Sequence, residues 1–324
     1  MRLAWVVVGV LLVALAAGVV LLDRRQAQRG APSLLGLRWR DLAPRPAAGP
    51  APAGRPTLPR NAAGRVAVIV DELGGRADVL DRLVALGRPL TVAVLPELPL
   101  ARRIARDAAR AGLEVLVQLP LEPYRFPEAD PGPGVLLSSM TPDEVTRRTR
   151  QQLASLPGAV GVATRMGSQF TEDRARMRAL LEPVFLQGLF FVDSLTSQRS
   201  VGYDLARALG IPAARRQVFL DPDEREATAR AGLVEAARWA ERHGSVVAIG
   251  HGRLLTVRLL EEALPGWEAR GLRLVPVSAL LSQAGGELRA PPPGPPSGYL
   301  PAHTEVTIPS RALSREAGAV RAAG

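Results

Sequence analysis

The chain of 324 residues has no cysteine and no lysine, and only 4% of its residues are aromatic. The absence of cysteine excludes a disulfide framework, a thiolate metal site and a cysteine nucleophile, although it identifies no cellular compartment. The low aromatic content leaves few rings to stack on nucleic-acid bases. Because lysine is absent, every long basic side chain is an arginine, which we attribute to a bias in composition rather than to function.

The net charge of +10 is unevenly distributed along the chain. Residues 1–65 hold ten arginines against two aspartates, and residues 283–324 hold four arginines against three glutamates, so the body between them carries one net positive charge. A nearly neutral body with few aromatic residues binds nucleic acid poorly, and we expect no nucleic-acid partner. The basic excess adjoins an apolar segment, where it would contact anionic lipid.

The N-terminal segment contains an uninterrupted apolar run at residues 3–22, which is long enough to cross a bilayer as a helix. Two interpretations remain open: residues 1–25 form a transmembrane anchor, or they form a signal peptide with its small-residue cleavage site at residues 14–16. The anchor is favoured because the apolar run continues past that site. In either case we expect the rest of the chain outside the cytoplasm, in the periplasm or cell envelope, or secreted after cleavage.

Two stretches lack any sustained periodicity. Residues 26–64 are rich in alanine, proline, glycine and arginine, which is typical of a semi-extended linker. Residues 283–324 contain the run PPPGPP, which cannot lie in a helix or a central strand. We predict that this C-terminal tail is disordered.

Residues 65–282 alternate short apolar runs with longer helical segments. The predicted strands are residues 66–70, 90–95, 113–117, 159–163, 189–193, 216–220, 246–250 and 272–277. The predicted helices are residues 77–86, 98–111, 141–156, 172–187, 199–209, 223–243 and 255–269, with Thr171 as the N-cap of the fourth. Because the strands are apolar throughout, we expect parallel strands covered on both faces. About seven such units predict one α/β domain, either a distorted barrel or a doubly wound sheet.

Polar residues follow most of the predicted strands. In a parallel α/β fold these strand ends lie on one rim, so residues far apart in the sequence converge there. The residues are Asp71, Glu72, Gln118, Glu122, Arg165, Ser168, Asp193, Ser194, Asp221 and His251. We take Arg165 as the centre of a candidate site, because its strand leads into a polar, glycine-containing loop before a helix. Each residue also has a structural interpretation, and for Asp221 a turn or cap is the favoured one.

Several of these stretches form a familiar series. VIVDELG at residues 68–74, LPLEP at 119–123, PGPG at 131–134, MGS at 166–168, GLFFVDS at 188–194 and AIGH at 248–251 resemble the divergent polysaccharide deacetylase family, over about residues 65–281. The resemblance implies a distorted (β/α) barrel exported to the cell envelope. It also implies hydrolysis of N- or O-acetyl groups on sugars with a bound divalent metal, commonly zinc.

The sequence departs from the family pattern at the metal. The pattern has two aspartates after the first strand, a histidine before Leu-Pro, Asn-His before Met-Gly-Ser, and a last histidine after Ile-Gly. Here Glu72 stands in place of the second aspartate, and Gln118 and Arg165 replace two histidines. The resemblance therefore implies Asp71, His251 and Asp193 as catalytic residues, Glu72 as the remaining metal ligand, and Arg165, Gln118, Glu122, Ser168 and Ser194 as substrate contacts.

Arg165 keeps its proton and places positive charge where the cation would lie, so we expect it to replace the metal and to pair with Asp71, Glu72 or Asp193. This favours a non-catalytic descendant without a metal that binds an envelope glycan or polysaccharide. The alternative is an active metal-dependent deacetylase with unusual ligands. A third interpretation is metal-free hydrolysis with Asp71 as base and Arg165 stabilising an oxyanion.

Overall fold

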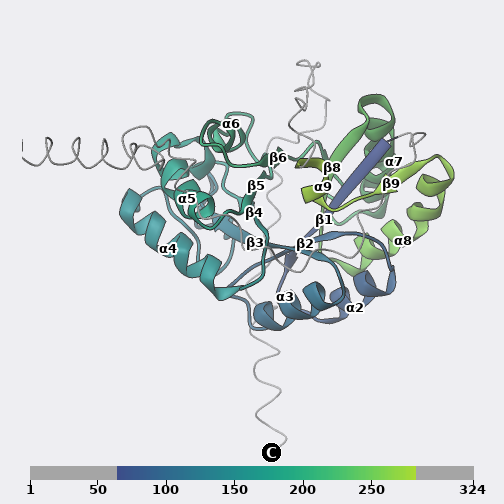
Figure 1. The fold of residues 1–324 in the computed structure, drawn as a ribbon, viewed down its shortest axis with the longest axis horizontal. Coiled ribbons are helices and arrows are strands. Elements are labelled where there is room, and N and C mark those ends of the chain that lie inside the picture. Colours follow the sequence, from purple (N-terminus) through teal and green to yellow (C-terminus); the bar gives the residue numbers. More distant parts are fainter. Residues whose placement is uncertain (1–63, 282–324) are drawn as a thin grey trace, which may run out of the picture. The chain divides into compact units, whose positions relative to one another are not determined.

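The computed structural model describes residues 64–281 (Figure 1). The predicted anchor or signal peptide, the linker and the C-terminal tail lie outside these residues. Among residues 64–281, no helix combines the length and the apolar character that a membrane span requires.

The described residues form a sheet of nine strands in the order β6-β5-β4-β3-β2-β1-β8-β7, with β9 paired to β1. All the pairings between these strands are parallel, as the apolar strands predict. The strands are β1 Gly64–Leu73, β2 Thr91–Val94, β3 Glu114–Leu121, β4 Gly161–Met166, β5 Phe190–Asp193, β6 Ala213–Arg215, β7 Val218–Phe219, β8 Ser245–His251 and β9 Leu272–Leu274.

Residues 213–219 form one short segment, bent at residue 217, that contributes both ends of this strand order. Its first half, β6, pairs with β5, and the backbone N–H of Arg216 continues this pairing by donating to Asp193 O at 3.0 Å. The backbone N–H of Gln217 donates to Val247 O at 2.9 Å, and β7 pairs with β8. A doubly wound sheet keeps its two edge strands apart, so the observed fold is instead a parallel α/β half-barrel. The single strand predicted at residues 216–220 is therefore wrong. The structure has two shorter strands, β6 and β7, and β6 begins three residues before the predicted start.

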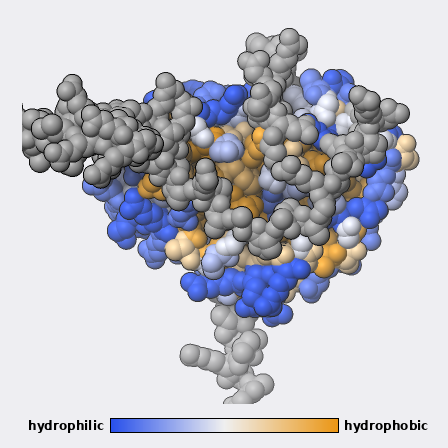
Figure 2. Space-filling view, viewed as in Figure 1, coloured by the Kyte–Doolittle hydropathy of each residue, from blue (hydrophilic) through white to orange (hydrophobic). Residues whose placement is uncertain are grey.

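Helices cover the outside of the half-barrel, and hydrophilic residues surround a more apolar centre on the face shown in Figure 2. They are α2 Asp78–Ala85, α3 Ala101–Arg110, α4 Pro142–Ser155, α5 Arg174–Leu186, α6 Gly202–Ala208, α7 Glu226–His243, α8 Leu254–Ala269 and the short α9 Val277–Leu281.

Two helix starts illustrate how local sequence sets these boundaries. Helix α4 begins as predicted, because Thr141 Oγ1 accepts a hydrogen bond from the backbone N–H of Glu144 at 3.3 Å. The prediction that Thr171 is the N-cap of α5 is wrong. The cap is Asp173, whose Oδ1 accepts hydrogen bonds from two backbone N–H groups of the first turn. Thr171 lies in the short 3-10 helix Phe170–Glu172 and donates its hydroxyl to Gly167 O at 2.8 Å.

The interior of the half-barrel is filled by alternate residues of the strands, since successive strand side chains point to opposite faces. This buried cluster consists of Ala67, Ile69, Ala93, Leu116, Ala163, Phe190, Val192, Ala214, Val247, Ile249, Val275, Val277 and Leu280. Two of its members, Val277 and Leu280, belong to α9, so the C-terminal helix contributes to the interior packing. The next inward position toward the carboxyl end of each strand is where a site can form.

We predict that Gly232→Ala lowers the free energy of unfolding by about 1–3 kcal/mol, because a methyl group there overpacks the helix against the sheet. A Cβ on Gly232 in α7 would lie 2.3 Å from the backbone oxygen of Leu220. Gly266→Ala in α8 is the matched control, since nothing lies within 4 Å of its Cβ position, and it should raise stability by about 0.5–1 kcal/mol. Urea unfolding of both variants checks this, and equal shifts would contradict the close packing.

Candidate functional site

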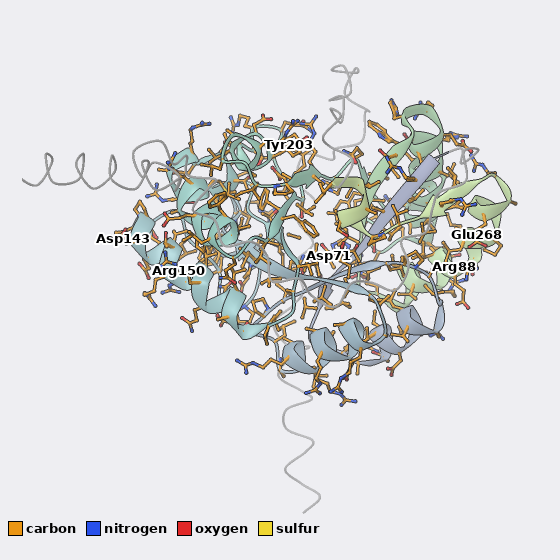
Figure 3. All side chains as sticks on the ribbon, viewed as in Figure 1. Asp71, Arg88, Asp143, Arg150, Tyr203 and Glu268 are labelled. Carbon is orange, nitrogen blue, oxygen red and sulfur yellow. The ribbon has the colours of Figure 1, made fainter. Side chains whose placement is uncertain are left out.

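Polar side chains occupy the inward positions at the carboxyl ends of six strands or strand extensions. Asp71 follows the core residue Ile69 by two positions, and His251 follows Ile249 in the same way. The two polar residues are in register between β1 and β8, and Asp71 lies inside the ring of helices (Figure 3). Four more polar residues each follow a core residue by two positions: Gln118, Arg165, Ser194 and Arg216. Because every second side chain of a strand points to the same face, these polar residues point inward together, as predicted for the strand ends.

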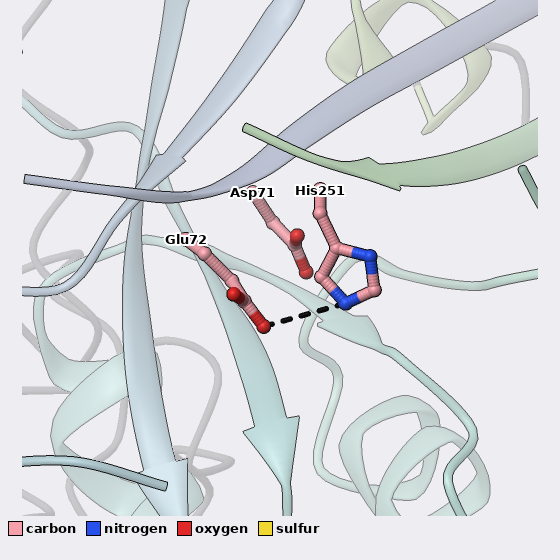
Figure 4. Close-up of side chains that lie close together, drawn as sticks. All are labelled: Asp71, Glu72 and His251. Atoms are coloured by element: carbon pink, nitrogen blue, oxygen red, sulfur yellow. Dashed lines mark ion pairs between the residues drawn. The ribbon is translucent and has the colours of Figure 1, made fainter. Parts of the chain in front are cut away.

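Glu72 joins this group through a break in the strand alternation. The register between β1 and β2 shifts between Val70 and Leu73, and Glu72 has φ 61°, a left-handed conformation that residues other than glycine adopt rarely. Its backbone N–H donates to Gln118 Oε1 at 2.7 Å. A bulge of this kind redirects a side chain, so consecutive carboxylates face the same region (Figure 4).

The guanidinium of Arg165 is buried, with only 4% of the side chain exposed, and it forms an ion pair with Glu72 Oε1. Its Nε donates to Pro131 O at 2.8 Å. Burial lowers the pKa of Arg165 to about 10, while the charge of Asp71 raises it and that of Arg253 lowers it. Arg165 is thus a cation at neutral pH. The prediction that Arg165 faces inward and pairs with a carboxylate is confirmed, and the carboxylate is that of Glu72.

Gln118 connects the two consecutive carboxylate residues. Besides accepting from the backbone of Glu72, it donates from Nε2 to Asp71 Oδ2 at 3.0 Å. The other carboxylate oxygen of Asp71, Oδ1, is buried and has no hydrogen-bond partner within residues 64–281. Burial raises the pKa of Asp71, and the nearby charges of His251 and Arg165 oppose this rise. Asp71 therefore keeps one unpaired carboxylate oxygen in a buried environment.

His251 is held between two carboxylates. Its Nδ1 lies 3.0 Å from Asp221 Oδ1, and its Nε2 lies 3.4 Å from Glu72 Oε1. Asp221 is almost fully buried and also accepts hydrogen bonds from the backbone N–H of His251 and the hydroxyl of Thr256. This corrects the prediction that Asp221 is a turn or cap residue: it belongs to the site. Its contact with His251, which lies 30 residues away, could not be predicted from the sequence, because it depends on the β7–β8 pairing.

Arg216 is a site residue that the predicted strand bounds did not identify. The strand was predicted to begin at residue 216, which placed Arg216 at the wrong end of it. In the structure Arg216 follows β6 and occupies an inward position. A correct strand boundary would have been a sufficient signal.

Asp193 lies apart from this group, and its role as a catalytic residue remains a prediction. It follows the inward residue Val192, so it faces the helices. Its Oδ1 accepts from the backbone N–H of Leu195 at 2.9 Å, and its Oδ2 accepts from Ser200 Oγ at 2.7 Å and the backbone N–H of Tyr203 at 3.0 Å. Within residues 64–281, no hydrogen bond or ion pair joins Asp193 to Asp71. Asp193 therefore orders the loop that leads into α6.

The three remaining predicted substrate contacts make hydrogen bonds that hold the rim loops. The backbone N–H and hydroxyl of Ser194 bond to Thr164 of the neighbouring strand. The carboxylate of Glu122 accepts from the backbone N–H of Ser138. Ser168 Oγ accepts from the backbone N–H of Tyr124 at 3.1 Å. Their prediction as substrate contacts remains a prediction.

Asp71, Glu72 and His251 offer ligand atoms that lie within 4.8 Å of one another, a donor set of the kind that binds divalent cations (Figure 4). The same oxygen of Glu72 that faces His251 is already paired with the guanidinium of Arg165. A metal at this point would lie against a fixed positive charge. The donor set as folded therefore does not fit a metal ion while Arg165 is in place.

The sequence and the fold are those of a known class of proteins. Residues 68–281 match the family model described as divergent polysaccharide deacetylase, and the chain belongs to that family. The chain is 32% identical over 230 residues to the uncharacterized protein YibQ of Escherichia coli strain K12, covering 71% of each chain. It is 28% identical over 249 residues to an uncharacterized protein of Haemophilus influenzae, covering 77% of this chain and 85% of the other.

A solved structure supports the same fold. The crystal structure of the uncharacterized protein ATU2773 from Agrobacterium tumefaciens C58 matches with a TM-score of 0.64 and 26% identity. The match covers 68% of this chain and 91% of that one. The family that the sequence motifs indicated is thereby confirmed.

We predict that Glu72→Gln lowers the free energy of unfolding by about 3–5 kcal/mol, because it leaves the buried charge of Arg165 unpaired. The matched control is Glu268→Gln, which removes the partner of Arg88 at the exposed ion pair on the outside of the domain (Figure 3). Solvent screens that pair, so stability should change little. Chemical unfolding of both variants measures the difference, and a small loss in Glu72→Gln would mean that Arg165 does not depend on this pair.

The raised pKa of Asp71 predicts a pH dependence of stability. The folded state binds a proton on Asp71 more tightly than the unfolded state, whose pKa is near 3.8, so this group's contribution to stability falls as pH rises through and above that value. Asp71→Asn removes the titration while keeping an acceptor for Gln118. The variant should gain stability relative to wild type between about pH 4 and pH 7. Urea midpoints across this range test it, and parallel curves for the two proteins would refute it.

Proposed function

We propose that this protein binds an envelope glycan at its strand-end site and does not hydrolyse it through a bound metal. The observation that carries the proposal is the buried ion pair between Arg165 and Glu72. We place this binding outside the cytoplasm because of the apolar run at residues 3–22, which lies outside the described residues.

Metal-dependent deacetylation needs an open coordination position that polarises the acetyl carbonyl and lowers the pKa of a bound water. A guanidinium has no such position, and with a pKa of about 10 Arg165 remains protonated at neutral pH. It stabilises negative charge but generates no hydroxide. The replacement therefore supports binding without this chemistry.

The remaining polar groups suit a sugar ligand. The unpaired Oδ1 of Asp71 is buried, and a hydrogen bond from a ligand would remove the free-energy penalty of that unpaired atom. Because burial raises the pKa of Asp71, the carboxyl group also becomes a hydrogen-bond donor at a higher pH than an exposed one. Hydroxyl and acetamido groups of a sugar supply the complementary donors and acceptors.

A second candidate function is an active deacetylase with unusual ligands, and one observation favours it. Asp71, Glu72 and His251 still converge within metal-binding distance of one another. A metal would gain access to this donor set if Arg165 moved away from Glu72. Asp71 would then serve as the base.

Metal content separates the two candidates. We expect the purified protein to hold no stoichiometric zinc after dialysis against trace zinc, because Arg165 occupies the cation position. The double variant Arg165→His, Gln118→His should bind about one zinc per chain, since it restores two histidine ligands to a site of preserved shape. Inductively coupled plasma mass spectrometry measures both.

Acetate release from a chitin tetrasaccharide completes the experiment. Stoichiometric zinc in the wild-type protein together with acetate release would refute the binding proposal and establish the deacetylase. Zinc-free protein that binds the tetrasaccharide without releasing acetate is the expected result. Absence of glycan binding in the zinc-free protein would refute the proposal as well.

A further inference from the structure

Arg216 directly follows β6 and occupies an inward position in the site already described. Its Nε donates to Ser194 O at 2.6 Å and its Nη2 donates to Leu195 O at 2.9 Å. The guanidinium stacks over the ring of Phe219, at 4.6 Å from the ring centroid. That ring in turn lies 5.0 Å from the imidazole of His251, centroid to centroid. Arg216 is thus held in a fixed orientation next to a residue of the site.

Arg216 differs from the other two arginines of the site in having no carboxylate partner. Arg165 pairs with Glu72, and Arg253 Nη1 lies 3.7 Å from Asp221 Oδ2. Within residues 64–281, no carboxylate comes within ion-pair distance of Arg216, and its Nη1 makes no hydrogen bond. Carbonyl oxygens satisfy two of its donors, but they do not neutralise its charge.

The charge of Arg216 persists despite its burial. Burial lowers the pKa of Arg216 to about 10, and the more distant charges of Asp71 and Asp193 oppose this. The group is therefore a partly buried cation at neutral pH, and a cation in such a place is stabilised by a paired anion. Two of its three nitrogens are already fixed, so binding an anion at the third would order little additional structure.

We propose that Arg216 binds a carboxylate of the ligand, so that the glycan taken by this site carries an acidic sugar. This inference rests on the proposed function and specifies its ligand. A guanidinium matches the geometry and charge of a carboxylate, whereas sugar hydroxyls would leave the charge unpaired. A single negative charge suits the site better than a phosphate dianion, because the charges of Asp71 and Asp193 already act on Arg216 and would repel a second one.

The first test uses the wild-type full-length chain and varies the ligand alone. Isothermal titration calorimetry compares three tetrasaccharides: neutral chitin tetrasaccharide, one in which N-acetylglucosamine alternates with glucuronic acid, and one in which it alternates with a lactyl-ether sugar. The two acidic tetrasaccharides are also tested as their methyl esters. We expect at least one acid to bind at least about tenfold more tightly than its own ester, which is the effect of one good charge-assisted contact. The two acids distinguish a uronate from a lactyl carboxylate.

The second test varies the protein. Arg216→Gln should remove the preference for the acid over its ester, so that the acid and its ester bind equally. Arg215→Gln is the matched control, because Arg215 is the adjacent arginine, at the end of β6, and its guanidinium stacks on Tyr203, at 5.3 Å from the ring centroid. It should keep the preference. Because the ester comparison needs no variant, the proposal remains testable if Arg216→Gln does not fold.

The outcomes separate this inference from the proposed function. Equal binding of both acids and their esters, with neutral sugar still bound, would overturn the role of Arg216 and leave glycan binding intact. Absence of binding by all the tetrasaccharides would overturn both. A preference for the acid that survives in Arg216→Gln would assign the carboxylate to another residue and overturn the inference.

Discussion

The buried charge of Arg165 is the constraint on which the organisation of the site depends. A guanidinium with 4% exposure requires a counter-ion, and Glu72 provides it only because the backbone at that residue is left-handed. That conformation is in turn held by Gln118, which accepts from the backbone of Glu72 and donates to Asp71. The cation, the bulge and the bridging amide are therefore parts of one arrangement, and none of them is explained without the other two.

The fold and part of the site could be predicted from the sequence. The rest could not, because the pattern that identifies a buried strand does not identify which of its residues face inward. Apolar runs with helical segments between them identify parallel strands and their order along the chain. The same runs conceal which residues face inward, because a strand buried on both faces has no alternation of polar and apolar residues. Asp193 was therefore assigned to the site although its neighbour Ser194 occupies the inward position, and Arg216 was missed through a shifted boundary. The contact of Asp221 with His251 depends on the pairing of β7 with β8, which the sequence does not reveal.

A side-chain cation in place of a metal changes what such a site can do. A metal exchanges with solution and responds to its supply, whereas the guanidinium of Arg165 is covalently part of the chain and remains charged across the physiological pH range. The site keeps a histidine between two carboxylates, and the remaining charges come from Arg165, Arg216 and Arg253. Under the proposed function, recognition by this arrangement rests on fixed charge and on hydrogen bonds.

The short segment of residues 213–219 has a consequence for the width of the site. It passes from β5 to β8 in a single step between Arg216 and Gln217, each of which is bonded through its backbone to a different side of the half-barrel. Consecutive Cα atoms are about 3.8 Å apart, so the two sides cannot separate here without breaking hydrogen bonds. A wider or narrower opening would therefore come from the loops that follow β3, β4 and β5. Variation in specificity among related chains is thus expected in loop length, at a constant spacing of the strands.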